Sequence, residues 1–228
     1  MPNLHFQITG VEAATRGLTP LLQFKLQISS AGGQAIEALL LSAQIQLQCP
    51  QRRYSPAEKE KLVDLFGKPE RWGQTLRNRV WALANTTVGA FTGSTETVVP
   101  VPCSYDLNVA TAKYFYALET GDVSLLFLFS GSVFYLSEGR LQVERISWRK
   151  ECQYRFAVRV WRELMERHHP NSAWVSMRRD VFDRLYAFKR RNGLATWEQA
   201  LELLLSGAAI EQTGSLASSI RLSHEVKT

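Results

Sequence analysis

The sequence predicts an α+β fold, in which an antiparallel, sandwich-like β body is followed by C-terminal helices. Residues 22–29 alternate strictly between apolar and polar side chains, the period of a strand with one buried face. Beyond Arg155 the apolar positions change to helical spacing. We therefore expect a β-rich domain over residues 1–150, a basic helical part packed on it over residues 151–206, and a disordered tail over residues 207–228.

Three runs near the N-terminus have the alternation of strands. The first places Leu4, Phe6 and Ile8 on one side, and residues 22–29 and 39–47 repeat the pattern. Turn-type residues around positions 17–20 and 31–33 separate the runs. Antiparallel pairing is the simplest arrangement of the three.

A short helix is predicted after these strands. Ser55 and Glu58 have the spacing of a capping box, in which each side chain bonds the other residue's backbone amide. Pro56 suits the first helical position. Gly67 should end the helix, and Pro69 is a second stop signal.

The remainder of the first 150 residues returns to strands, with one more short helix. Strand-like runs cover residues 80–83, 86–88 and 95–101. Proline cannot donate to a ladder, so Pro100 and Pro102 make the last run either a sheet edge or an irregular extension. Residues 110–118 have a helical pattern, and residues 125–135 and 141–146 predict a hairpin around Gly139.

Three helices are predicted at the C-terminal end. The first ends at His168-His169, the second ends at Gly193, and Thr196 with Gln199 forms a capping box that opens the third. The apolar positions of the first two helices are Phe156, Val160, Trp161 and Leu164, then Val181, Leu185 and Phe188.

Composition is that of an ordinary globular protein. The chain is 45% apolar and 21% charged, values typical of a protein that folds by itself. No run reaches the roughly 18 apolar residues of a membrane span, and the first residues lack the features of a secretory signal. We expect a cytoplasmic protein without a membrane span.

Residues that bind metals or form disulfides do not cluster in the sequence. Cys49, Cys103 and Cys152 are far apart and include no Cys-x-x-Cys pair. His168 and His169 would project about a hundred degrees apart on a helix, so they cannot chelate one metal as an i, i+4 pair would. The sequence predicts no metal and no cofactor.

No catalytic motif is complete. The sequence has neither the Gly-x-Ser-x-Gly turn of serine hydrolases nor the His-Glu-x-x-His motif of zinc proteases. Its acidic residues are scattered, although carboxylates from distant segments can meet in a folded site. We therefore expect a protein that is not an enzyme.

The formal net charge of +6 is concentrated in one segment. Residues 140–191 hold fourteen Arg and Lys against six Asp and Glu, a net charge of +8, whereas the remainder of the chain carries −2. A partner is therefore expected at this basic segment.

Residues 174–179, followed by two helices, resemble a ribbon-helix-helix repressor unit. In that family, paired strands from two chains enter the major groove of DNA. The resemblance implies that Ser176 and Arg178, or else Val175, Met177 and Arg179, face the bases, depending on register. Ser176, Arg178 and Arg179 are the candidate nucleic-acid residues. The simpler alternative is two helices packed on the β domain with their arginines in water.

Four segments resemble an uncharacterised bacterial family of unknown function, and the similarity runs from the first strand to about Leu205. The segments are Arg53-Tyr54-Ser55-Pro56-Ala57-Glu58, Asp64-Leu65-Phe66-Gly67-Lys68-Pro69-Glu70-Arg71-Trp72, Pro100-Val101-Pro102-Cys103-Ser104-Tyr105-Asp106 and Leu128-Phe129-Ser130-Gly131-Ser132-Val133-Phe134-Tyr135. Members are often encoded beside actinobacterial-type high-affinity nickel–iron hydrogenases. The resemblance implies an accessory or assembly role and names no active-site residues.

Together these observations predict a non-enzymatic accessory protein that binds a protein partner, with hydrogenase subunits as candidates. Trp and Arg are enriched at binding hot spots. The candidate contact residues are Trp148, Arg149, Lys150, Trp161 and Trp174. A DNA-binding protein is the alternative, and a homo-oligomer stays open.

Overall fold

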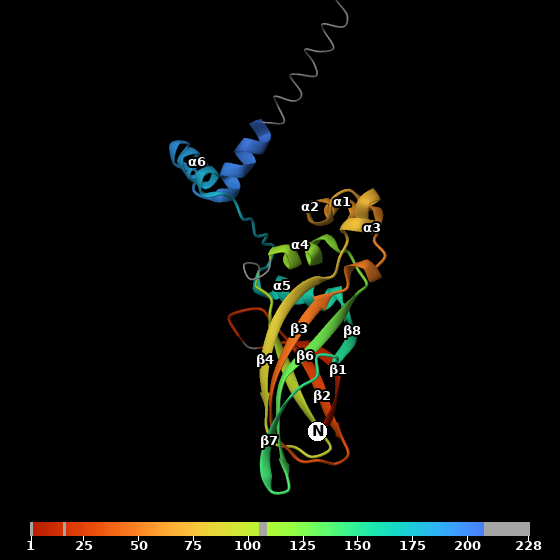
Figure 1. Cartoon of the computed structure of the whole chain (residues 1–228). Coiled ribbons are helices and arrows are strands. Elements are labelled where there is room, and N and C mark those ends of the chain that lie inside the picture. The colour runs from red at the N-terminus through yellow and green to blue at the C-terminus, as the bar shows by residue number, and fades with distance from the viewer. Residues whose placement is uncertain (1, 16, 105–108, 208–228) are drawn as a thin grey trace, which may run out of the picture. The chain divides into compact units, whose positions relative to one another are not determined.

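The computed structural model describes residues 2–15, 17–104 and 109–207, which fall into two compact units (Figure 1). The first unit is Met1–Ala173, and the second begins at Trp174. The division therefore follows residue 173, whereas the sequence placed a boundary at residue 150. The expected tail, residues 207–228, lies outside the described residues apart from Gly207.

Two antiparallel sheets form the body of the first unit, which confirms the α+β, sandwich-like prediction. The first sheet has the order β1 (Asn3–Ala13), β2 (Leu21–Ala31) and β5 (Ser94–Pro102). The second has the order β4 (Arg79–Val88), β3 (Ile36–Leu47), β6 (Asp122–Ser137) and β7 (Arg140–Arg145), and β8 (Glu151–Ala157) also pairs with β6. Strand β4 lies beside β5, and β8 beside β1, so the two sheets meet along both sides.

Strand β6 has two successive partners along one edge. Its residues 132–137 pair with β7 and its residues 122–128 pair with β8, while β3 pairs along the other edge. Gly131 lies where the partner changes, with a φ of +136°. A Cβ atom there would lie 1.9 Å from the Leu40 carbonyl oxygen, so only glycine allows β3 and β6 to approach at this point.

Aromatic side chains fill the space between the sheets. Phe6 of β1 stacks on Phe129 of β6 with ring centroids 4.6 Å apart. Phe24 of β2 is fully buried and lies 5.2 Å from Phe127 of β6 and 6.1 Å from Trp81 of β4, both edge-on. The alternating apolar positions of the strands therefore meet in one continuous core.

Helices close one end of the sandwich. Helix α4 (Val109–Ala117) packs on α5 (Val158–His168), and Phe115 stacks on Trp161 with centroids 5.1 Å apart. Figure 1 shows these helices at the end of the sheets opposite the β6–β7 hairpin. Short helices follow β3, namely η1 (Cys49–Gln51), α1 (Pro56–Lys61), α2 (Val63–Phe66), η2 (Pro69–Arg71) and α3 (Trp72–Thr75).

The predicted capping box is present and belongs to a buried polar network. The Glu58 amide donates to the Ser55 hydroxyl, and the Ser55 amide donates to the Glu58 carboxylate. Arg52 forms an ion pair of 2.7 Å with Glu58 and donates to the carbonyls of Thr120 and Asp122. The side chains of Arg52 and Glu58 are 10% and 4% exposed. This network ties the segment after β3 to the start of β6.

The second unit holds two helices within the described range. Helix α6 spans Arg179–Arg191, and residues 197–207 form the second helix. The predicted capping box at its start is present, because the Gln199 amide donates to the Thr196 hydroxyl and the Thr196 amide donates to the Gln199 side chain.

Three local expectations differ from the structure. Strand β3 does not join β1 and β2 but pairs in the other sheet, because alternation shows which face is buried and not which strand lies alongside. Residues 151–157, predicted as the start of the helical part, form strand β8 on the free edge of β6. Residues 174–178 are in neither helix nor strand.

Substituting Gly131 should destabilise the first unit. Gly131→Ala places a methyl group against the Leu40 carbonyl and a positive φ on a non-glycine residue, so we expect a loss of at least about 2 kcal/mol in the free energy of unfolding. Urea denaturation followed by tryptophan fluorescence measures this loss. Gly89→Ala is the matched control, because no atom lies within 4 Å of its Cβ position. Equal stability of the two variants would contradict the close approach of β3 and β6.

The ion pair of Glu58 should make stability depend on pH. Burial alone would raise the pKa of the Glu58 carboxyl, but hydrogen bonds from the amides of Glu119 and Ser55 and from Arg52 outweigh burial and hold the pKa below its ordinary value. A depressed pKa in the folded state adds stability above the unfolded-state pKa of about 4.3, and this stability is lost as the pH falls through the folded-state pKa.

We therefore expect Glu58→Gln to cost about 2 kcal/mol or more at pH 7, because Arg52 loses its buried counter-charge. The difference from the unsubstituted chain should shrink as the pH is lowered below about 4. Urea denaturation over a pH series measures it, with the exposed Glu60→Gln as control. A difference that is constant with pH would show that Glu58 is not ionised in the folded chain.

Candidate partner-binding surfaces

The second unit exposes large apolar side chains on both of its helices and on the segment that precedes them. Their exposed fractions range from 40 to 71%. We call this set the C-terminal apolar face; it consists of Trp174, Val175, Met177, Phe182, Tyr186, Leu201, Leu203, Leu204 and Leu205. Ala200 is the buried hydrophobic residue of the described part of this unit, residues 174–207. Exposed apolar side chains in this number make the unit a candidate interaction site.

A small aromatic cluster holds the two helices of this unit together. Trp197 lies 5.3 Å from Phe182 and 6.0 Å from Tyr186, measured between ring centroids. The Lys189 ammonium lies 5.5 Å from the Trp197 ring centroid, a cation–π contact. Phe182 and Tyr186 remain 42% and 46% exposed despite these contacts. The cluster fixes the hairpin but does not cover it.

The backbone before α6 has unused hydrogen-bonding groups. The amides and carbonyls of residues 174–177 make no hydrogen bond with any described residue. Arg178 has extended backbone angles, with φ of −65° and ψ of 147°, and its carbonyl accepts from the Phe182 amide. Within the described residues, the backbone groups of residues 174–177 are therefore not used by secondary structure.

Charge in the second unit is less one-sided than the sequence suggested. Its described residues carry six basic and four acidic side chains. Arg178 forms an ion pair of 3.0 Å with Asp180, and both side chains are exposed. Arg179 begins α6 and is exposed, as is Ser176. The basic segment of residues 140–191 is thus divided between the two units.

Three of the predicted contact residues lie in one loop of the first unit. Trp148, Arg149 and Lys150 connect β7 to β8, beside the point where β6 changes partner. Trp148 is 79% exposed, and the Arg149 guanidinium lies 5.4 Å from its ring centroid. The Lys150 ammonium donates to the Asn3 side chain. We call residues 147–150 the Trp148 loop; it presents an aromatic and a cationic group together.

The remaining two tryptophan candidates have opposite environments. Trp161 is 4% exposed and stacks on Phe115, so it belongs to the core that α4 and α5 form. It is therefore not part of either proposed binding surface, because a binding contact requires exposed area. Trp174 is 45% exposed and begins the second unit. Residue type alone did not separate these two cases.

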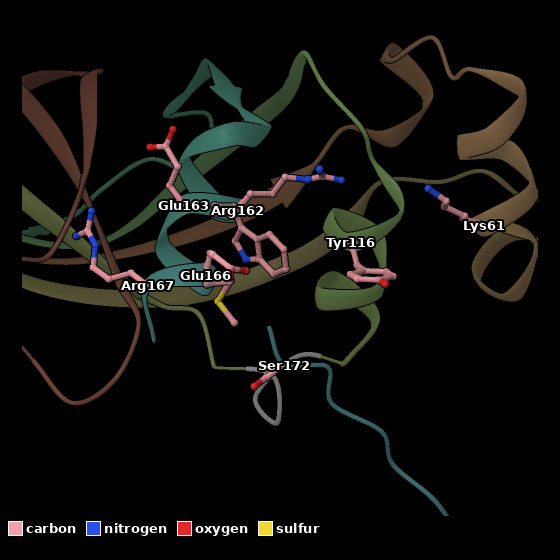
Figure 2. Close-up of a pocket in the computed structure, with 9 residues that line it drawn as sticks. Lys61, Tyr116, Arg162, Glu163, Glu166, Arg167 and Ser172 are labelled. Atoms are coloured by element: carbon pink, nitrogen blue, oxygen red, sulfur yellow. The ribbon is translucent and has the colours of Figure 1, made fainter. Parts of the chain in front are cut away.

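A groove of about 760 Å³ lies over α4 and α5 in the first unit (Figure 2). Figure 2 shows Arg162 extending toward the side where Lys61 and Tyr116 lie, while Arg167 points to the opposite side. The Arg162 guanidinium donates to the Leu118 carbonyl, and Glu166 accepts from the Asn171 amide. Arg162 and Glu166 thus each bond a backbone group, and Arg162 and Arg167 point away from each other.

The thiol groups are in environments that keep them protonated. Burial raises the pKa of Cys49 to about 11 and that of Cys103 to about 12. Burial also raises the pKa of the Cys152 thiol. A thiolate is the reactive form of cysteine, so none of these groups is set up as a nucleophile near neutral pH.

The described residues, 2–15, 17–104 and 109–207, hold neither a cluster of metal ligands nor a helix suited to cross a membrane. No three His, Cys, Asp or Glu side chains within that range lie together as they would around a metal ion. His168, at the end of α5, has its Nδ1 atom 2.9 Å from the Leu164 carbonyl oxygen, which is a helix C-terminal contact. No helix in the same range combines the length and apolar character that crossing a membrane requires.

Comparisons with known proteins give a family but no activity. A family model described as a family of unknown function, DUF6084, matches residues 1–213 and so includes both units as described. No curated protein matches the chain.

Similar solved structures include a β-glucosidase from Kluyveromyces marxianus, at 10% identity over 68% of this chain and 15% of that one, with a TM-score of 0.25. Another is β-glucosidase 3B from Thermotoga neapolitana in complex with α-D-glucose, at 15% identity over 67% of this chain and 17% of that one, with the same TM-score. The chain thus spans about a sixth of the length of these enzymes. Likeness at this level carries no inference about activity.

Sequence reasoning missed most of the C-terminal apolar face. The helical pattern pointed to Val181, Leu185 and Phe188, which are half-buried, and not to Phe182 or Tyr186. A usable signal was present, because Phe182, Tyr186 and Lys189 recur at i, i+4 and i+7 and form a second face on α6. Helix α6 therefore has more apolar surface than the second helix of the unit can cover.

Proposed function

The chain belongs to DUF6084, a family of unknown function, and from the geometry of its second unit we propose that it is a non-enzymatic accessory protein that binds a protein partner. The C-terminal apolar face carries this proposal. Nine large apolar side chains lie within residues 174–207, each at least 40% exposed. Burying such surface gains roughly 25 cal/mol per Å², so a protein that covers this face is favoured thermodynamically.

The non-enzymatic part of the proposal is supported by the surroundings of the reactive groups. Two charged residues of the groove, Arg162 and Glu166, bond backbone groups, and burial raises the pKa of the thiols. A general acid or base needs a convergent neighbour. Arg162 and Arg167 point to opposite sides of the groove (Figure 2).

Hydrogenase subunits are the heterologous partners that the sequence resemblance suggests. The Trp148 loop is the proposed contact for such a partner, because it pairs an exposed indole with a guanidinium at 5.4 Å on a loop anchored by two strands. The cytoplasmic location expected from the sequence stays a prediction.

A photo-crosslinking residue at position 205 tests whether the face contacts protein in the cell. Leu205 is 70% exposed on the face, whereas Leu83, the control position, is 74% exposed on β4 of the first unit. We expect a covalent adduct of one defined mass at position 205 and none at position 83. The protein in that adduct, once purified, should bind the unsubstituted chain at least about tenfold more tightly than a Leu204→Asp variant. No adduct at position 205 would overturn the proposal.

Nucleic-acid binding is the second candidate function. The observation in its favour is that the extended Arg178 and the first residue of α6, Arg179, are both exposed beside the free backbone of residues 174–177. Against it, Arg178 pairs with Asp180, and four acidic side chains offset six basic ones in the described part of this unit. Protein binding is therefore better supported.

Fluorescence anisotropy with a labelled DNA duplex separates the two candidates. If protein binding is the function, we expect no saturable binding at 50 mM salt, and Arg178→Ala with Arg179→Ala should change nothing. If DNA is the ligand, affinity should fall steeply between about 50 and 200 mM salt. The double variant should then lower the slope of log affinity against log salt by about two.

A further inference from the structure

We propose that strand β7 pairs antiparallel with β7 of a second copy of this chain, about a two-fold axis at Gln142, so that the larger sheets of the two copies become one. The residues that carry this inference belong to the first unit. The inference therefore goes beyond the proposed function and does not depend on the C-terminal apolar face.

Strand β7 has an edge that no other described strand uses. It is the last strand of its sheet and pairs with β6 along its whole length. Just after the strand, the Ile146 amide donates to the Gly131 carbonyl of β6. Backbone groups of alternate residues point to the same side of an antiparallel ladder, so those of Leu141 and Val143 point to the free edge. They are available to a further strand.

Exposed apolar side chains lie on one face of the β6–β7 hairpin. Leu136 pairs with Leu141 and Phe134 pairs with Val143, and residues that lie directly opposite share a face. The exposed fractions of Leu136, Leu141 and Val143 range from 45 to 59%. A strand added beside β7 would shield Leu141 and Val143 from water.

The opposite face of the hairpin holds a carboxylate with an unused oxygen. The Tyr135 hydroxyl donates to Oε1 of Glu144 at 2.7 Å. The other oxygen, Oε2, is buried and has no hydrogen-bond partner among the described residues. A buried acceptor without a donor is costly, and more so when it is charged. Glu144 as a whole is half-buried, which leaves it within reach of a side chain on an added strand.

The side chains of β7 match those of a second β7. With the axis at Gln142, Leu141 lies opposite Val143 of the other copy, and Arg140 lies opposite Glu144 of the other copy. The first pair joins two apolar groups whose backbones exchange hydrogen bonds. The second pair gives the unused Glu144 oxygen an arginine donor. Two-fold symmetry repeats both pairs.

Other registers lose this match. Two residues exchange backbone hydrogen bonds only where both point to the shared edge, so the axis must pass through a residue and not between two. With the axis at Val143, Leu141 would lie opposite Arg145. With the axis at Leu141, Glu144 would lie opposite Glu138 of the other copy, which sets like charges together.

The order of charges favours a second copy over an unrelated strand. Charged residues on an edge strand usually prevent pairing with other strands. In β7, however, Arg140 and Glu144 have opposite signs and are placed symmetrically about Gln142. The strand that fits must carry the same charges in reverse order, and an antiparallel copy of β7 supplies that order.

Cysteine scanning of the full chain tests the partner and the register. Gln142 would lie directly opposite Gln142 of the other copy, with Cβ atoms about 4.5–5.5 Å apart, close to what a disulfide needs. Positions 141 and 143 would each lie about 7–8 Å from their own equivalents, as diagonal neighbours do. Gln142→Cys should therefore form an interchain disulfide without reductant, at least about fivefold more than Leu141→Cys or Val143→Cys. The unsubstituted chain, with its own three cysteines, sets the background.

Sedimentation velocity under reducing conditions supplies an independent readout. We expect the unsubstituted chain to sediment at twice the 25.8 kDa mass of one copy. Arg140→Glu sets like charges opposite each other and removes the donor to Glu144, so it should weaken association at least about tenfold. Arg145→Glu is the matched control, because it makes the same charge change on the same strand but lies opposite Gly139, which has no side chain. Circular dichroism checks that both variants are folded.

Three outcomes would contradict this inference. A single-copy mass for the unsubstituted chain would overturn it. A double mass that Arg140→Glu leaves unchanged would also overturn it, because the contact would then lie elsewhere. A disulfide maximum at position 141 or 143 would overturn the register. The crosslink at position 205 tests the proposed function separately, since Leu205 belongs to the second unit.

Discussion

The pairing of β6 along both of its edges is the constraint on which the first unit depends. One edge is used by β3 over most of its length, and the other is shared by β7 and β8. The change of partner forces the intervening chain out of the sheet and places Trp148 in solvent. Gly131 permits β3 to stay close at the same point. The exposure of Trp148 and the need for glycine at position 131 thus have one cause. Strand β6 is longer than either β7 or β8, the two strands that share its second edge.

Polar contacts then hold the helical end of the sandwich. The Arg52–Glu58 pair ties the chain after β3 to the turn before β6, and the Arg162 guanidinium of α5 donates to the Leu118 carbonyl after α4. Removing one member of such a buried set leaves the others desolvated without a partner, so the set acts as a unit. Arg162 therefore helps to hold α5 against the chain that follows α4.

Local chemistry could be predicted from the sequence better than long-range placement. The alternation at residues 22–29, the capping boxes at Ser55 and Thr196 and the edge position imposed by Pro100 each depend on neighbours in the chain, and each is present. Which sheet β3 joins depends on strands that are far away in the sequence. The alternation of apolar and polar residues does not identify those strands. The position of Phe156 suits the apolar spacing of a strand and of a helix equally well. The sequence therefore predicts helix for residues that form β8. Trp161 and Trp148 differ in burial only because of what lies around them.

The two units differ in how they bury apolar surface. In the first unit the two sheets pack against each other, and the large aromatic side chains between them are almost fully buried. The second has a helical hairpin whose apolar residues outnumber the positions that its own two helices can cover. Covering the face therefore adds stability in proportion to the logarithm of partner concentration. The proposed partner would therefore stabilise this unit more as its concentration rises.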